Sequence, residues 1–367
     1  MRTTPPVDKW FLRILATLVA FGFLIFTSAS LGLLARDGAR YGNVTMTQFI
    51  AILLGASVAY LISRIDYHRL RQFALPLLLL SSALTLLVFI PGIGFEHGGA
   101  NRWIAFGSLS FQPSELLKIA FVIYAAAFFS AVKAKIATVR FGLIPLIVLA
   151  VIAGVILLAQ PDTDTFMVLF LALVGMFLVA GGKWKHLFIV GIIGLLCLSA
   201  LVWQRPYLRE RLLTYLDPSA DPLGAGYQIQ QSLIAIGSGG FTGKGFGQSV
   251  QKFSYLPEPI GDSIFAVAGE EFGFIGGILL IGLYLAFLLR GLRIATGAPD
   301  RFGGLLSLGI VILIGAGAFM NIAAMLSIIP LSGLPLSFVS HGGTALLFTM
   351  AEAGILLNVS RQQGPAS

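Results

Sequence analysis

The chain has 367 residues, of which 57% are hydrophobic and only 11% are charged. A soluble domain carries about a quarter charged residues, so this sequence lacks the polar surface of a soluble fold and is too apolar to be disordered. The formal net charge of +8 would suit a nucleic-acid-binding protein, but basic residues also follow membrane topology. The composition therefore predicts an all-α, polytopic membrane protein.

Ten apolar stretches run along the chain, and each is long enough for a membrane-spanning helix. The first is too long for the core of a signal peptide and has no Ala-x-Ala site after it, so we expect a retained span. Short links between the fifth, sixth and seventh stretches predict antiparallel neighbours. The predicted spans are 12–34, 47–63, 74–90, 113–132, 142–159, 164–180, 186–203, 264–289, 303–325 and 340–358.

The Lys and Arg residues between these spans are distributed unevenly. Fifteen lie on the side that holds both termini, and eight lie on the other side, five of them in one long segment. Because short cytoplasmic loops collect positive charge, we expect both termini in the cytoplasm, and this topology explains the basic charge without nucleic acid. The chain is then one membrane domain, residues 1–367, with a long extracytoplasmic loop at 204–263.

The loop at 204–263 is the longest between spans, and long loops usually carry function. Its amphipathic stretch Tyr227–Ile236 predicts a short interfacial helix. A glycine-dense stretch follows at 237–247, but Ser238 and Gly245 break the pattern of a phosphate-binding P-loop. These glycines fit either a close approach of the backbone to an anionic head group or a flexible turn.

Several ionisable residues lie in or beside apolar stretches, where each is costly. Glu115 and Lys118 are three residues apart, so they share a helix face and can pair. Such a pair is either a neutralised structural pair or part of a cavity that opens outward. Asp262 precedes the eighth span, which carries Glu270 and Glu271 near its start. From spacing alone Asp262 is better explained as a helix cap than as a general base.

Other catalytic residue types form no pattern of a site in the sequence. The single cysteine, Cys197, excludes an intrachain disulfide and a cysteine metal site. The four histidines stand far apart, which disfavours zinc, and Ser340-His341 lacks the Gly-x-Ser-x-Gly pattern of a serine hydrolase. The residues alone therefore predict an outward-facing polar site that acts on an amphipathic molecule.

Four segments carry a more specific signal: Gly99–Ile104, Phe111–Lys118, Tyr255–Glu271 and Leu334–Gly343. Together, and in this order, they resemble the SEDS family, the bacterial peptidoglycan polymerases that include FtsW and RodA. The similarity extends over nearly the whole chain, and a SEDS fold of ten spans agrees with the predicted helices. Asp217-Pro218 and Asp221-Pro222 in the outer loop make the chain most similar to the division-type FtsW.

The resemblance implies a glycosyltransferase that polymerises lipid II, a disaccharide-pentapeptide on undecaprenyl diphosphate. The reaction would take place at the outer face of the cytoplasmic membrane and serve cell division or shape. The 4-hydroxyl of an acceptor sugar would attack the anomeric carbon of the donor glycan, and the lipid diphosphate would leave. A single-pass partner is also implied, a class B penicillin-binding protein with transpeptidase activity.

The resemblance assigns site residues by position. Asp262 matches the family's essential aspartate, as the base or as a ligand of an assisting divalent cation, Mg or Mn, and no organic cofactor is implied. Positive charge is needed for the leaving diphosphate. The implied substrate contacts are Arg102 and Lys118, with Glu115 orienting Lys118, and Lys244 and Lys252 from the outer loop.

A few positions depart from the family pattern, and two other functions are considered beside the glycosyltransferase. Gly261 and Ser263 replace the usual Thr and Phe around Asp262, Asp164 adds a carboxylate, and His341 replaces a tyrosine. One alternative is a transporter, or flippase, of the lipid-linked precursor. It would need gating helices broken at mid-membrane, and no such break is evident in the sequence. The other alternative is a non-catalytic scaffold for a cell-wall transpeptidase.

Overall fold

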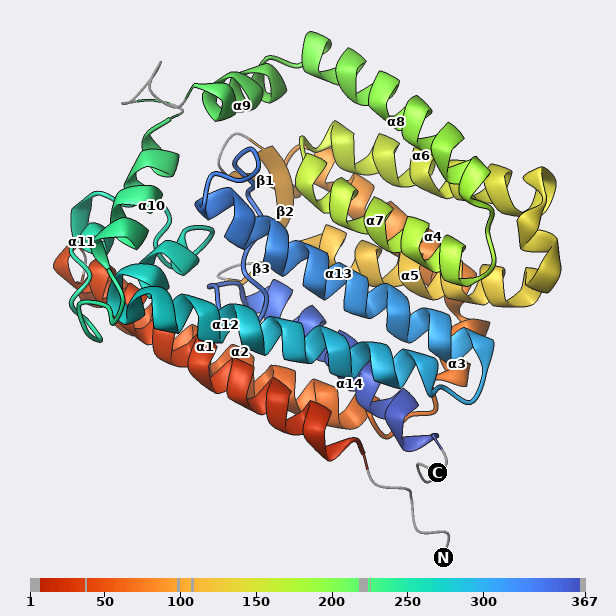
Figure 1. Ribbon diagram of the computed structural model, residues 1–367, viewed down its shortest axis with the longest axis horizontal. Coiled ribbons are helices and arrows are strands. Elements are labelled where there is room, and N and C mark those ends of the chain that lie inside the picture. Colours follow the sequence, from red (N-terminus) through yellow and green to blue (C-terminus); the bar gives the residue numbers. More distant parts are fainter. Residues whose placement is uncertain are drawn as a thin grey trace, which may run out of the picture.

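The computed structural model describes residues 7–36, 38–97, 100–106, 109–217, 224 and 226–363. The Asp221-Pro222 motif, Pro218 and Gly99 lie outside these described residues. Within them the chain forms one helical bundle, and both ends of the chain emerge at the same end of it (Figure 1). This arrangement agrees with the even number of predicted spans.

The described residues contain all ten predicted helices, eight of them long and apolar enough to cross a membrane. These eight are α1 (Lys9–Arg36), α2 (Gly38–Ile62), α5 (Pro113–Val132), α6 (Ile144–Ala159, with the π-helical turn η3, Val139–Leu143, before it), α8 (Trp184–Gln204), α12 (Ile264–Thr296), α13 (Arg301–Met325) and α14 (Gly343–Arg361). The other two apolar helices are shorter: α4 (Ala74–Leu86), extended by the 3₁₀ turn η1 (Leu87–Phe89), and α7 (Thr163–Val179).

Short elements connect these helices. The predicted interfacial helix is present as α10 (Tyr227–Ser238), and a small antiparallel sheet that was not predicted lies between α4 and α5. In this sheet Ile104 of the central strand pairs with both Gly94 and Phe111. The strands are β1 (Gly94–His97), β2 (Ala100–Phe106) and β3 (Leu109–Phe111); the remaining short helices are α3 (His68–Gln72), η2 (Lys133–Ala137), α9 (Pro206–Leu216) and α11 (Gln251–Ser254).

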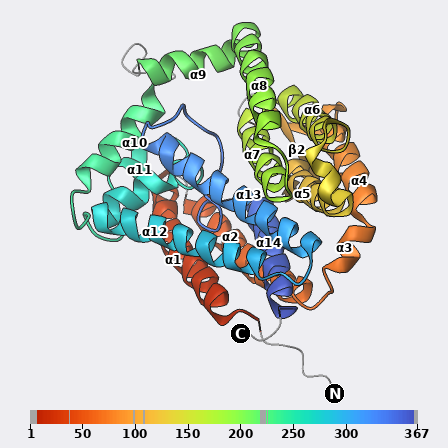
Figure 2. The ribbon, with the colours of Figure 1, turned by 45° about the vertical axis from the view of Figure 1, so that its right-hand side comes forward.

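Helix α13 forms the centre of the bundle, packed against α12, α7 and α5. Its most apolar window is 78% buried, whereas the corresponding window of α8 is only 11% buried. Gly309 allows the close packing of α13, because a Cβ there would lie 2.6 Å from Sδ of Met176 on α7 and 2.6 Å from Cγ1 of Val122 on α5. In both views α8 lies at the edge of the bundle, and α9 leads from it towards α10 (Figures 1 and 2).

Helix α12 differs from the prediction in two ways. It ends at Thr296 rather than at residue 289, so its last turns carry Arg290 and Arg293 beyond the apolar run. It is also interrupted at Gly273, whose φ of 64° and ψ of −161° are not helical. This break does not contradict the expectation that no helix is broken at mid-membrane. The break lies near the start of α12 rather than at its middle. This end of the bundle is called the outer end, after the orientation that the charges predict.

The glycine-dense stretch of the outer loop fills this break. In a continuous helix the amides of Phe274 and Ile275 would donate to the carbonyls of Glu270 and Glu271. Here those groups bond to the glycine-dense stretch instead, so its backbone closes the break in α12. A head-group contact and a flexible turn both stay predictions. The four bonds are Phe274 N to Gly240 O (2.9 Å), Ile275 N to Phe241 O (3.2 Å), Lys244 N to Glu270 O (3.0 Å) and Gly245 N to Glu271 O (3.0 Å).

Candidate functional site at the outer end of the bundle

Asp262 lies two residues before α12 and does not cap it. The helix begins at Ile264 with Ser263 as its N-cap residue, and no side chain caps it, so the reading of Asp262 as a helix cap is wrong. Its backbone is fixed from the centre of the bundle, because Nδ2 of Asn321 on α13 donates to the Asp262 carbonyl at 2.8 Å. The backbone at Asp262 is therefore held at a defined place, and its side chain does not serve as a cap.

Three charged side chains from distant parts of the chain meet at Gly333. A Cβ built on Gly333 would lie 3.7 Å from Oδ2 of Asp262, 3.9 Å from Nη2 of Arg211 and 3.9 Å from Oδ2 of Asp164. Arg211 forms an ion pair with Asp164 at 3.0 Å, and the Gly333 amide donates to the same carboxylate oxygen at 3.0 Å. We call Asp164, Arg211 and Asp262 the outer polar cluster.

The surroundings of Asp262 favour its protonated form. Burial raises the pKa of its carboxyl to about 7, and the negative charges of Glu258 and Asp164 act in the same direction. The positive charges of Arg211 and Arg102 lower this pKa and partly offset the burial. A carboxyl group with a pKa near neutrality can accept and release a proton at physiological pH, which is the property a general base needs.

Arg102 reaches this region from strand β2. Its guanidinium donates to the backbone carbonyls of Gln160, at 3.1 Å, and Pro161, and it lies 3.6 Å from a carboxylate oxygen of Asp162. Asp162 is the N-cap of α7 and accepts a hydrogen bond from the Thr165 amide. Arg102 thus ties the small sheet to the turn between α6 and α7. A contact of Arg102 with substrate stays a prediction.

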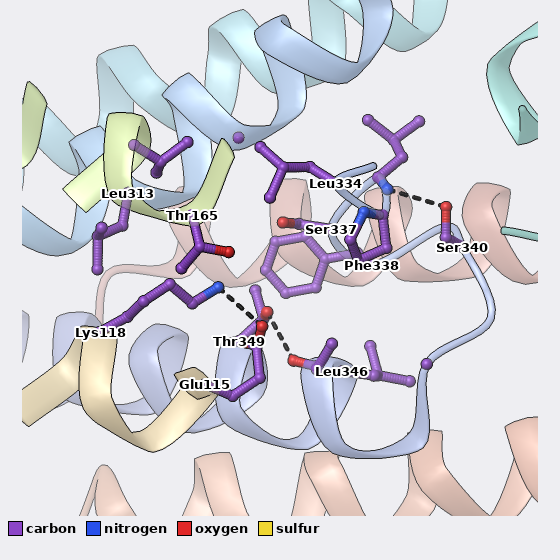
Figure 3. Close-up of a pocket in the computed structure, with 16 residues that line it drawn as sticks. Glu115, Lys118, Thr165, Leu313, Leu334, Ser337, Phe338, Ser340, Leu346 and Thr349 are labelled. Atoms are coloured by element: carbon purple, nitrogen blue, oxygen red, sulfur yellow. Dashed lines mark hydrogen bonds and ion pairs between the residues drawn. The ribbon is translucent and has the colours of Figure 1, made fainter. Parts of the chain in front are cut away.

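Glu115 and Lys118 agree with both explanations of their spacing, a neutralised structural pair and part of a cavity. They form an ion pair of 2.9 Å at the start of α5, and they also line a cavity between α5, α7, α13 and α14 (Figure 3). The carboxyl group of Glu352 on α14 is also close enough to interact with Lys118, so this lysine lies among two carboxyl groups. The pair is therefore both neutralised and placed where a ligand could meet it.

One segment, residues 333–340, connects the cavity with the outer polar cluster. Gly333 contacts the cluster, and the residues from Leu334 onward form one wall of the cavity (Figure 3). Ser340 fixes this segment, since its hydroxyl donates to the Gly261 carbonyl at 2.7 Å and accepts from the Leu336 amide at 2.9 Å. Asp262 itself does not line the cavity. The candidate site therefore has two neighbouring parts.

The two lysines of the outer loop do not support the predicted substrate contacts. Lys252 has no exposed side-chain surface and forms an ion pair of 2.6 Å with Glu271. Lys244 is one-third exposed and pairs with Glu270, also at 2.6 Å. Both ammonium groups neutralise buried carboxylates of α12, and the substrate contacts of Lys244 and Lys252 stay predictions.

Sequence reasoning missed Arg211, Glu258, Asn321 and Gly333 as parts of the site. Arg211 was considered only for its charge in the outer loop, and Asp164 only as an extra carboxylate. A sequence signal existed for Asp164, because an additional acid beside a membrane helix is unusual. Nothing in the sequence indicated that α9 brings Arg211 to Asp164.

The described residues contain no group of three or more His, Cys, Asp or Glu side chains that could hold a metal ion. Asp164 and Asp262 supply oxygen donors, which suit Mg²⁺ or Mn²⁺, but within the described part of the chain they do not form a protein-only cage. The divalent cation stays a prediction.

Comparison with known proteins places this chain in a protein family. A model of the FtsW, RodA and SpoVE family, described as a cell cycle protein, matches residues 8–364. The chain belongs to this family. It is 41% identical to stage V sporulation protein E of Bacillus subtilis over 84% of each chain. It is 36% identical to the probable peptidoglycan glycosyltransferase FtsW of Geobacter sp. (strain M18) over 100% of each chain.

Solved structures agree with this membership of the FtsW, RodA and SpoVE family. One, from work described as "Structural coordination of polymerization and crosslinking by a peptidoglycan synthase complex", superposes with a TM-score of 0.82 at 30% identity, covering 97% of this chain and 98% of that one. RodA of Thermus thermophilus has a TM-score of 0.71 at 27% identity, over 98% of each chain. The predicted SEDS fold of a multi-pass, all-α membrane protein is confirmed.

Proposed function

We propose that this chain is a peptidoglycan glycosyltransferase that polymerises lipid II at the outer face of the cytoplasmic membrane, with both termini in the cytoplasm. Membership of the family and relatives named FtsW support the enzyme class. The observation that carries the chemistry is the outer polar cluster, in which Asp262, with a pKa of about 7, lies next to Arg211.

The reaction needs one proton acceptor. A bond forms between the acceptor's 4-hydroxyl oxygen and the anomeric carbon of the donor glycan, while the bond from that carbon to the diphosphate oxygen breaks. The hydroxyl proton passes to the Asp262 carboxylate, and the leaving diphosphate keeps the bonding electron pair. A positioned base of this kind contributes roughly 10²- to 10⁴-fold to a rate.

The leaving diphosphate also needs positive charge. Arg211 and Arg102 lie near Asp262, and Lys118 faces the cavity on the other side of residues 333–340. Each of these cations is already balanced by a carboxylate: Asp164, Asp162 and Glu115 respectively. Such pairing holds the cations in place before the substrate binds, which reduces the reorganisation needed in the transition state.

The proposed partner is a single-pass class B penicillin-binding protein that cross-links the strands. Its support is the structural similarity of this chain to a component of a peptidoglycan synthase complex whose description joins polymerisation and crosslinking. The proposed biological role is cell division or shape, on the basis of the relatives named FtsW and SpoVE.

The test is glycan polymerisation from purified lipid II by the wild type and Asp262→Asn, each with and without the partner transpeptidase. Asn has nearly the same shape as Asp but cannot accept the proton at neutral pH. We expect product from the wild type and a loss of at least 100-fold in the variant. Asp66→Asn is the matched control, because Asp66 is exposed at the other end of the bundle. It should keep wild-type activity.

The alternatives predict different results. A flippase would move labelled lipid II across vesicle membranes with either residue at position 262, and a scaffold would stimulate the transpeptidase with either residue. Equal polymerisation by folded wild type and Asp262→Asn would remove Asp262 as the base. Repeating the assay with EDTA, Mg²⁺ or Mn²⁺ tests the divalent cation, which is expected to raise the wild-type rate.

A further inference from the structure

The outer section of α12, Ile264–Phe272, is separated from the rest of the helix by the break at Gly273. A continuous helix would fix this section through its own hydrogen bonds, but here the bonds across the break go to the glycine-dense stretch. The section begins two residues after Asp262. Whatever holds its inner end therefore influences where the Asp262 carboxyl lies.

Glu271 is the centre of a buried network at that inner end. One of its carboxylate oxygens accepts hydrogen bonds from Nζ of Lys252 (2.6 Å), the Ser28 hydroxyl (2.7 Å) and the Ser249 amide (3.3 Å). Lys252 also donates to the Ser28 hydroxyl at 3.0 Å. Since Ser28 belongs to α1, the network joins the outer loop, α12 and α1.

The backbone of the outer loop packs directly against α1 beside the Glu271 network. A Cβ on Gly32 of α1 would lie 2.4 Å from the carbonyl oxygen of Lys252, so only glycine allows this contact. The neighbouring Glu270 binds the loop further, accepting from the Ser249 hydroxyl at 2.5 Å and the Val250 amide at 3.1 Å. The Glu271–Lys252 pair is thus a fully enclosed junction rather than a surface ion pair.

We propose that Glu271 and Lys252 are a positioning pair, which fixes the outer section of α12 against α1 and so places Asp262 for catalysis. Asn321 holds the other end of the section at the Asp262 carbonyl. This role rests on the proposed function, and it replaces the substrate contact expected for Lys252. A positioning pair acts through Asp262 and does not touch the substrate.

Kinetics distinguish the two roles of Lys252. Misplacement of a catalytic group by about 1 Å can cost roughly 100-fold in rate. We expect Lys252→Met to lower kcat for lipid II polymerisation at least 10-fold with KM changed less than about 3-fold. Lys244→Met should cost less, because Glu270 keeps its bonds to Ser249 and Val250. A raised KM with unchanged kcat in Lys252→Met would overturn the proposal.

Two further variants keep the test decisive. Lys252→Met/Glu271→Gln removes both charges and leaves no buried unpaired ion, so it should fold if the single variant does not. We expect it to keep the low kcat, and a wild-type kcat would contradict the positioning role. Lys185→Met, an exposed lysine at the start of α8, is the matched control with unchanged kinetics.

A readout without lipid II separates this proposal from the proposed function. Hydrogen exchange of the amides in 264–272 should be faster in the double variant than in the wild type, and unchanged in Lys185→Met. If the wild type does not polymerise lipid II, the proposed function fails, and hydrogen exchange alone decides whether the pair holds this section. Equal exchange in wild type and double variant would overturn the positioning pair.

Discussion

The protonation of Asp262 should control the rate of the wild-type enzyme. Burial raises the pKa of this carboxyl to about 7, and only the deprotonated form can accept the proton of the sugar hydroxyl. We therefore expect the polymerisation rate to rise with pH up to about 7 and to level off above it. Initial rates between about pH 5 and 9, at saturating lipid II, give the profile. A flat profile would contradict a base at this position.

Arg211 should shift that profile, because its charge lowers the pKa of Asp262. Removing the charge in Arg211→Met also leaves Asp164 without its ion-pair partner, and Asp164 raises the same pKa. Both effects act in one direction, so the midpoint of the profile should move to higher pH. Arg209→Met, which removes a neighbouring charge on α9, is the comparison. A midpoint unchanged in Arg211→Met would mean that Arg211 does not act on Asp262.

The contacts of the individual site residues set a limit on what sequence can predict. The positions of Glu115 and Lys118 followed from helix spacing, which is local. Arg211 and Asp164 form their ion pair only because α9 folds back over the bundle. The spacing of these two residues along the chain does not predict this contact. The ion pair of Lys252 could not be predicted for a related reason, since its partner Glu271 lies in a different element.

At the scale of elements, the break in α12 depends on Gly273. Its φ of 64° disfavours any side chain, and a Cβ would lie 2.3 Å from the Gly243 amide nitrogen. We expect Gly273→Ala to lower the free energy of unfolding by about 2 kcal/mol through strain and displacement of the glycine-dense stretch. Thermal unfolding in detergent measures the loss. Gly282→Ala is the control in the same helix, because nothing lies within 4 Å of its Cβ and Ala suits a helix.

The elements themselves were largely predictable because the bilayer imposes long apolar runs. All ten helices overlap the predicted apolar stretches, although α2 begins earlier and α12 ends later than predicted, and α10 matches its amphipathic pattern. The three strands are too short for a period-2 pattern to stand out in a loop. The break at Gly273 could not be predicted from the neighbouring sequence, because the hydrogen-bond partners of the backbone groups at the break come from residues 240–245.

For the whole molecule, the orientation in the membrane is a prediction from charge alone. In a background without the native cysteine, Cys197→Ser, we expect Gln248→Cys to react with a membrane-impermeant maleimide in intact cells. Lys135→Cys should react only after permeabilisation. Both positions are exposed, so access depends on the side of the membrane. Labelling of Lys135→Cys alone in intact cells would reverse the predicted topology.

The hydrogen bonds between the glycine-dense stretch and α12 also set the depth in the membrane at which the reaction takes place. Counting back from Arg290, about twenty residues span the hydrocarbon. In the predicted orientation Glu270 and Glu271 then lie near its outer boundary, and Asp262, which precedes the first turn of α12, lies above that boundary. That height corresponds to the head-group layer, where the diphosphate of a prenyl lipid resides while its tail stays among the acyl chains. The polymer can thus grow in the aqueous space while each donor is consumed without leaving the bilayer.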